Sequence, residues 1–186
     1  MTPLFSSPIE EVIFWAVLVA YFASVLMWVA GHRGRHGKRR RDLVPLILLA
    51  IPVVIWIGYA RIGPLPHWLF YPGEILFVVG AAFTAWSYAI LGRYLSPYAQ
   101  VYPEHRVIED GPYRHIRHPG YLGQIVAFIG LGLALQSWVA LVALLIVAGS
   151  LLAYRIRIEE ELMAAELGDS YVNYMARTKR LLPSIW

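Results

Sequence analysis

Five long apolar runs constrain the fold of this 186-residue chain more than any other feature. They cover about residues 9–30, 43–59, 68–91, 121–135 and 138–154. Each run approaches the roughly 17 to 25 residues that a helix needs to cross the hydrocarbon core of a bilayer. With 59% apolar side chains, the chain is too hydrophobic for an ordinary soluble domain of its size. We therefore predict an all-α, polytopic membrane protein with five transmembrane helices. We interpret its first run as a retained helix rather than a signal peptide, because no basic region precedes it.

The sixteen Lys and Arg side chains are distributed unevenly between the loops. Residues 31–42 hold six of them, residues 92–118 hold four, the tail from residue 155 holds five, and Arg61 stands alone. Because basic loops stay on the cytoplasmic side, we predict an N-terminus outside and a C-terminus in the cytoplasm, in a bacterial inner membrane. We interpret the basic run at 31–42 as a topological anchor near anionic membrane lipids. No nucleic-acid-binding motif accompanies it, so we predict no nucleic-acid partner.

The chain changes character at residue 155, where acidic residues appear after thirty-four residues without any. We expect a helix that continues through Leu167 and ends at Gly168, and a second short helix at about Asp169–Arg177. Pro183 is expected to close this tail. The chain shows no internal repeat, and we predict a single domain over residues 1–186.

The loop before the fourth apolar run is rich in polar and aromatic side chains. Pro119 suits the first turn of a helix, where free N–H groups can face an anionic ligand group such as a carboxylate. The alternative interpretation is that Tyr113, His118 and Tyr121 merely lie at the membrane interface. Cysteine is absent, and the four histidines between 67 and 118 lack the helical spacing beside a carboxylate that a metal site would show, so we predict no metal site.

A second group of charged residues begins where the fifth run leaves the membrane. Arg155 and Glu159 are four residues apart and therefore share one helix face, where they can form a simple ion pair. Ionisable groups at the edge of the hydrocarbon are costly unless they are paired or used. A cationic cofactor and an anionic substrate could therefore each take one of these partners.

Taken together, these segments resemble a known family. The motif begins with Gly111-Pro-Tyr-Arg-His-Ile-Arg-His-Pro-Gly-Tyr-Leu-Gly123, and Arg155-x-x-x-Glu-Glu160 follows about thirty residues later. Gly168-x-x-Tyr171-x-x-Tyr174 and Leu182-Pro183 complete it. The combination is similar to the isoprenylcysteine carboxyl methyltransferase family and its phospholipid N-methyltransferase relatives, over roughly residues 74–186.

The resemblance implies an S-adenosylmethionine-dependent methyltransferase whose cofactor lies in a cytoplasmic region formed by residues 92–120 and 155–186. It implies a catalytic, substrate-contacting role for Arg155, although Arg157 remains an alternative, and a structural role for Glu160. The implied cofactor-binding residues are Gln100, His105, Arg106, Val107, Ile108, Tyr113, His118, Pro119, Gly120, Tyr121 and Glu159. Tyr98 is the alternative to Gln100 in this set.

The resemblance also implies a lipophilic methyl acceptor, and we favour the carboxylate of a prenylated cysteine. A phospholipid amine is the first alternative, because the stretch Ala99–Glu104 departs from the family pattern. A non-catalytic membrane protein of the same fold and a nicotinamide-dependent reductase are the others.

Overall fold

The computed structural model describes residues 5–31, 38–39, 45–96, 98–102 and 104–181, and it describes no side chains between 28 and 50. Most of the basic run at 31–42, and Pro183, therefore lie outside the described residues. The longer helices are α1 (Pro8–Gly31), α2 (Pro45–Tyr59), α3 (Phe70–Leu91), α4 (Pro119–Ala134), α5 (Trp138–Leu167) and α6 (Asp169–Arg177). Short 3-10 helices occupy η1 (His67–Leu69), η2 (Gly92–Tyr94) and η3 (Gly111–Arg114).

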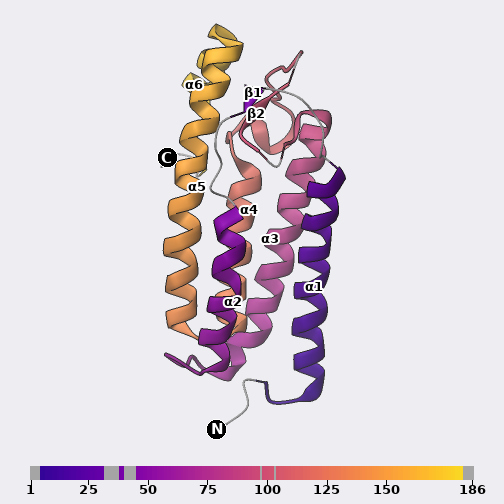
Figure 1. Cartoon of the computed structure of the whole chain (residues 1–186), viewed down its shortest axis with the longest axis vertical. Helices are drawn as coiled ribbons and strands as arrows, with labels where there is room; N and C mark the ends of the chain where they lie inside the picture. The colour runs from indigo at the N-terminus through magenta and orange to yellow at the C-terminus, as the bar shows by residue number, and fades with distance from the viewer. Residues whose placement is uncertain (1–4, 32–37, 40–44, 97, 103, 182–186) are drawn as a thin grey trace.

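Helices α1 to α5 coincide with the five predicted apolar runs and run alongside one another as an elongated bundle (Figure 1). Three of them, α1, α3 and α5, are long and apolar enough to cross a membrane. Helices α2 and α4 are shorter, with 15 and 16 residues. The predicted helix ends are also found, because α4 begins at Pro119 and α5 ends at Leu167, directly before Gly168, whose φ of 56° favours glycine.

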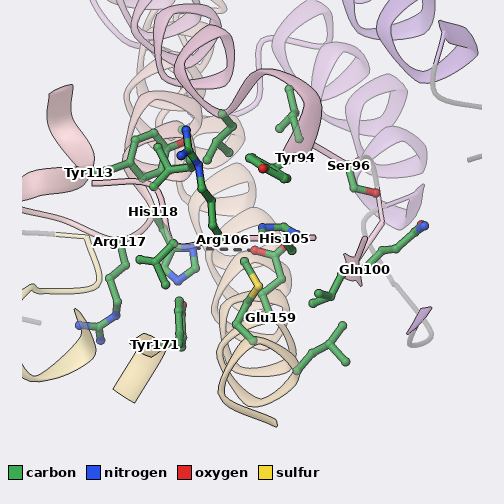
Figure 2. A pocket seen from close by; sticks show the side chains of 18 of the residues that line it. Tyr94, Ser96, Gln100, His105, Arg106, Tyr113, Arg117, His118, Glu159 and Tyr171 are labelled. Atoms are coloured by element: carbon green, nitrogen blue, oxygen red, sulfur yellow. Dashed lines mark ion pairs between the residues drawn. The ribbon is translucent and has the colours of Figure 1, made fainter. Parts of the chain in front are cut away.

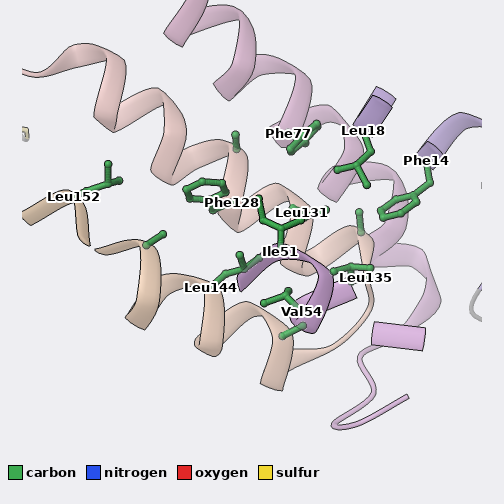
Figure 3. Close-up of a cluster of buried hydrophobic side chains, with 14 of the residues drawn as sticks. Phe14, Leu18, Ile51, Val54, Phe77, Phe128, Leu131, Leu135, Leu144 and Leu152 are labelled. Atoms are coloured by element: carbon green, nitrogen blue, oxygen red, sulfur yellow. The ribbon is translucent and has the colours of Figure 1, made fainter. Parts of the chain in front are cut away.

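Large apolar side chains from all five helices meet along the axis of the bundle (Figure 3). Phe14 of α1, Val54 of α2 and Leu144 of α5 are almost inaccessible to solvent. Other large apolar side chains, such as those of Trp56, Ile75 and Ile146, point outward and remain exposed. An apolar surface of this kind on a bundle of apolar helices is what contact with lipid requires.

Helices α3 and α4 form the closest packing in the bundle, and glycines make it possible. A Cβ atom on Gly80 would lie 2.4 Å from the backbone nitrogen of Ala127, and one on Gly130 would lie 2.3 Å from that of Phe77. Small residues let helix backbones approach where lipid supplies no hydrophobic force between helices. This contact fixes the position of the first turn of α4 relative to the end of α3.

The two ends of the bundle differ in structure. At the end nearer the N-terminus, residues 135–137 link α4 to α5 in a tight hairpin, and the Ser137 hydroxyl accepts a hydrogen bond from the Ala140 amide at 3.1 Å. The opposite end carries the 92–118 loop and α6 (Figure 1). It also carries a feature that the sequence did not predict: strand β1 (Lys38–Arg39) pairs antiparallel with β2 (Gln100–Val101).

Replacing Gly130 with Ala tests the packing of α3 against α4. The added methyl group must push two backbones apart, so we expect a loss of about 1 to 3 kcal/mol of stability. Thermal unfolding of purified protein in detergent measures this loss. Gly149→Ala in α5 is the matched control, because a Cβ atom there meets nothing within 4 Å. Equal unfolding temperatures for the two variants would contradict the proposed packing.

Candidate functional site

A cavity opens at the end of the bundle that carries the 92–118 loop (Figure 2). Its wall is formed by the last turns of α3, the 92–118 loop, the first turn of α4, the extension of α5 and one face of α6. A concave site that combines apolar and aromatic side chains with a few charged groups is a candidate for binding a small molecule.

The first turn of α4 forms part of this wall. The amides of Tyr121 and Leu122 both donate to the carbonyl of His118, at 3.1 and 3.2 Å. Proline has no N–H, so the Gly120 amide is the one amide of this turn that these bonds leave available to a ligand. The sequence had suggested several such amides. Gly120 also has to be small, because a Cβ atom there would lie 2.4 Å from the ring of Tyr88.

Glu159 occupies the centre of a charged cluster. Its Oε1 accepts hydrogen bonds from the Tyr121 hydroxyl at 2.6 Å and from Arg155 Nε at 2.7 Å. Arg155 Nε also lies 2.6 Å from the Tyr121 hydroxyl oxygen. The predicted ion pair between Arg155 and Glu159 is therefore present, but Tyr121 already donates its hydroxyl proton to Glu159 rather than offering it to a ligand. Arg155 is buried here, whereas Arg157 is exposed on another face of α5.

The imidazole of His118 lies between two carboxylates. Its Nδ1 is 3.8 Å from Oε2 of Glu159, and its Nε2 is 3.4 Å from Oε1 of Glu160. Figure 2 shows His118 and Glu159 facing each other across the cavity wall. The geometry at Nε2 does not form a hydrogen bond, so this buried atom has no hydrogen-bond partner. His118 thus brings a buried polar group to the cavity beside the charged cluster.

Glu160 holds the elements around the cavity together. Its two oxygens accept hydrogen bonds from Arg117 Nε at 2.7 Å and from Arg180 Nε at 2.8 Å. Arg117 also donates to the carbonyls of Met175, at 3.1 Å, and Thr178. One buried carboxylate therefore links the loop before α4, helix α5 and the segment after α6. The sequence suggested a structural role for Glu160 but not these two arginine partners.

Aromatic rings form another part of the wall. The ring centroids of Tyr94 and His105 are 4.8 Å apart with their planes tilted by 31°, and Nδ1 of His105 is buried without a hydrogen-bond partner. Burial lowers the pKa of His105, so its ring is neutral at neutral pH. This part of the wall is therefore aromatic and uncharged.

The cavity brings together almost all of the residues that the sequence singled out. Every predicted cofactor-binding residue lines it except Pro119, which is fully buried beneath the first turn of α4. Tyr98, the alternative to Gln100, lines it as well. Arg155 does not line it but bonds to two residues that do. The wall also contains several residues without a predicted role, which include Tyr88, Tyr94, Arg117, Leu162, Met163, Tyr171 and Tyr174.

Replacing Glu160 with Gln tests the structural clamp. The change leaves Arg117 and Arg180 without their shared negative charge, and breaking a buried ion pair costs about 3 kcal/mol or more. We expect a marked fall in thermal stability in detergent. Glu109→Gln is the control, since Glu109 and Arg177 form an ion pair in which both side chains are largely exposed. Such pairs contribute less than about 1 kcal/mol, so a loss as large as that of Glu160→Gln would contradict this assignment.

Fold and site together define an integral membrane protein with a cavity, lined by apolar, aromatic and charged residues, at one end of its helical bundle. The sequence model of the isoprenylcysteine carboxyl methyltransferase family matches residues 74–165. Over this segment, which carries most of the cavity wall, the chain is similar to that family. The resemblance inferred from the motifs is confirmed.

Curated relatives carry corresponding names. A "Probable protein-S-isoprenylcysteine O-methyltransferase" of Oryza sativa subsp. japonica is 25% identical over 186 residues, which cover 93% of this chain and 95% of that protein. A "Protein-S-isoprenylcysteine O-methyltransferase" of Schizosaccharomyces pombe is 29% identical over 82 residues, 44% of this chain and 35% of that protein. The solved structure of the eukaryotic intramembrane Ras methyltransferase ICMT superposes with a TM-score of 0.74 at 18% identity, covering 98% of this chain and 70% of that one, and so shares its fold.

Proposed function

We propose that this protein is an S-adenosylmethionine-dependent methyltransferase that acts on the carboxylate of a prenylated cysteine. The observation that carries the proposal is the position of Glu159, held by Arg155 and Tyr121 beside His118 in the wall of the cavity. The names of the relatives point to the same reaction and the same acceptor.

The described residues fit this cofactor. When bound, S-adenosylmethionine supplies a methyl group activated by an electron-poor sulfur. Glu159 offers a carboxylate for the ammonium of its amino acid end, while His118 and the Gly120 amide offer donors for its carboxylate. The aromatic wall of Tyr94 and His105 suits the flat surface of a nucleoside base. The other predicted residues, Gln100, Arg106, Val107, Ile108 and Tyr113, line the remaining wall.

The charges of the cavity favour a carboxylate acceptor over an amine. Among the described residues that line the cavity, Glu159 is the sole acid, and it already accepts two hydrogen bonds. An ammonium group would need a base to remove its proton before reacting. A carboxylate is already ionised at neutral pH, and Arg155 can orient it. With the cofactor bound, methyl transfer to the carboxylate oxygen would need no base, because no proton would be transferred.

We further propose that all five helices α1 to α5 span the membrane as one domain, with the cavity end in the cytoplasm. The strand pairing, the 92–118 loop and α6 gather at that end, as the distribution of basic residues requires (Figure 1). This arrangement places the cavity at the cytoplasmic edge of the hydrocarbon, where a water-soluble cofactor and a lipid-anchored acceptor can meet. A bacterial inner membrane remains our prediction for its location.

The acceptor assignment predicts the chemical nature of the product. Incubation with methyl-labelled S-adenosylmethionine and N-acetyl-S-farnesylcysteine in detergent is expected to yield a labelled lipid whose label is released as methanol by alkali. A methyl ester behaves in this way, whereas an N-methyl group resists alkali. Phosphatidylethanolamine is the comparison acceptor, and alkali-stable label on it would contradict a carboxylate acceptor.

Matched arginine variants complete this assay. Arg155→Lys keeps the charge but loses the planar fork, so we expect turnover to fall by about tenfold or more. Arg157→Lys changes an exposed side chain on another face of the same helix, and turnover is expected to stay at the wild-type level. Equal turnover in both variants would remove Arg155 from the site.

A further inference from the structure

A pair of polar side chains lies on the membrane side of the cavity and has no part in the cofactor assignment above. Tyr88 belongs to α3 and Gln124 to α4, one helical turn beyond Tyr121 toward the middle of the bundle. The Gln124 amide nitrogen donates to the Tyr88 hydroxyl at 2.6 Å. Tyr88 also lines the cavity. The pair therefore joins the two most closely packed helices at the floor of the site.

Packing alone does not account for this pair. Helices α3 and α4 are already held by their glycine contacts and by the Thr84 hydroxyl, which donates to the Gly120 carbonyl at 3.1 Å. Polar side chains within apolar helices are costly, and where they occur they commonly mark functional sites. The ring of Tyr88 occupies the space that a Cβ atom on residue 120 would need, so glycine at this position allows the ring to lie in the cavity wall.

The surroundings of Tyr88 suit an anionic group. Tyr88 lines the same cavity as Tyr121 and Glu159, and Arg155 Nε donates to both of these residues, at 2.6 and 2.7 Å. Once Glu159 engages an ammonium group, the guanidinium of Arg155 becomes available to a second anion on this side. A phenol and a primary amide are neutral groups that can hydrogen-bond to a carboxylate beside that guanidinium.

We infer that Tyr88 and Gln124, together with Arg155, form the subsite that receives the acceptor's carboxylate from the membrane side of the cavity. The inference rests on the proposed function. It adds Tyr88 and Gln124 as residues that bind the acceptor but do not contact the cofactor. It also accounts for release of the product, because a methyl ester carries no charge for Arg155 and is a weaker hydrogen-bond acceptor than a carboxylate.

Acceptor binding without turnover tests this subsite. Calorimetry in detergent, with the cofactor site saturated by S-adenosylhomocysteine, compares N-acetyl-S-farnesylcysteine with its uncharged carboxamide. We expect the wild type to prefer the free acid, and we expect Tyr88→Phe and Gln124→Met each to reduce this preference by about tenfold, as loss of a hydrogen bond to a charged group does. Affinity for S-adenosylhomocysteine is expected to stay within about twofold, because neither variant removes a group assigned to the cofactor.

Thr84→Val is the matched structural control, because it removes a different hydrogen bond between the same two helices. We expect it to lower the unfolding temperature while leaving the preference for the free acid unchanged. The subsite would be overturned if Tyr88→Phe and Gln124→Met both kept the wild-type preference for the free acid. It would also be overturned if they lost as much affinity for S-adenosylhomocysteine as they lost preference for the free acid. Either result would leave the proposed function standing. A wild type that binds neither S-adenosylhomocysteine nor the free acid would overturn both.

Discussion

The pairing of Arg155 with Glu159 is the interaction on which the rest of the site depends. Both charges lie at the edge of a hydrocarbon-like interior, where an unpaired charge would be strongly unfavourable. The Tyr121 hydroxyl joins the pair and thereby links α5 to the first turn of α4. An ammonium group can replace Arg155 at Glu159, and a carboxylate can then pair with the guanidinium, so that neither charge is left unpaired. The cluster therefore favours one cationic and one anionic ligand group.

Two further constraints keep this cluster in place. Glycines let the backbones of α3 and α4 approach closely, and this contact fixes the height of the first turn of α4 beside the end of α3. Glu160, next to Glu159 on α5, binds Arg117 and Arg180. The two adjacent carboxylates thus have different roles. Glu159 lines the cavity, and Glu160 binds the loop before α4 and the segment after α6.

The features that the sequence predicted correctly are those with local causes. Long apolar runs gave the helices, Pro119 and Gly168 marked helix ends, and the i, i+4 spacing gave the pair of Arg155 and Glu159. The missed contacts join residues that are far apart along the chain, as in the bond between Arg117 and Glu160 or that between Tyr88 and Gln124. No local pattern marks such partners. The pairing of β1 with β2 is of the same kind, since two-residue strands have no periodicity to detect.

The central claim is that Glu159 holds the cofactor's amino acid end, and titration calorimetry with S-adenosylhomocysteine in detergent tests it most directly. The wild type is compared with Glu159→Gln and with Glu161→Gln, whose side chain is exposed on the same helix. We predict wild-type binding that Glu161→Gln retains and that Glu159→Gln weakens by about tenfold or more, because a charged hydrogen bond to the ammonium is lost. Undiminished affinity in a folded Glu159→Gln variant would contradict the account.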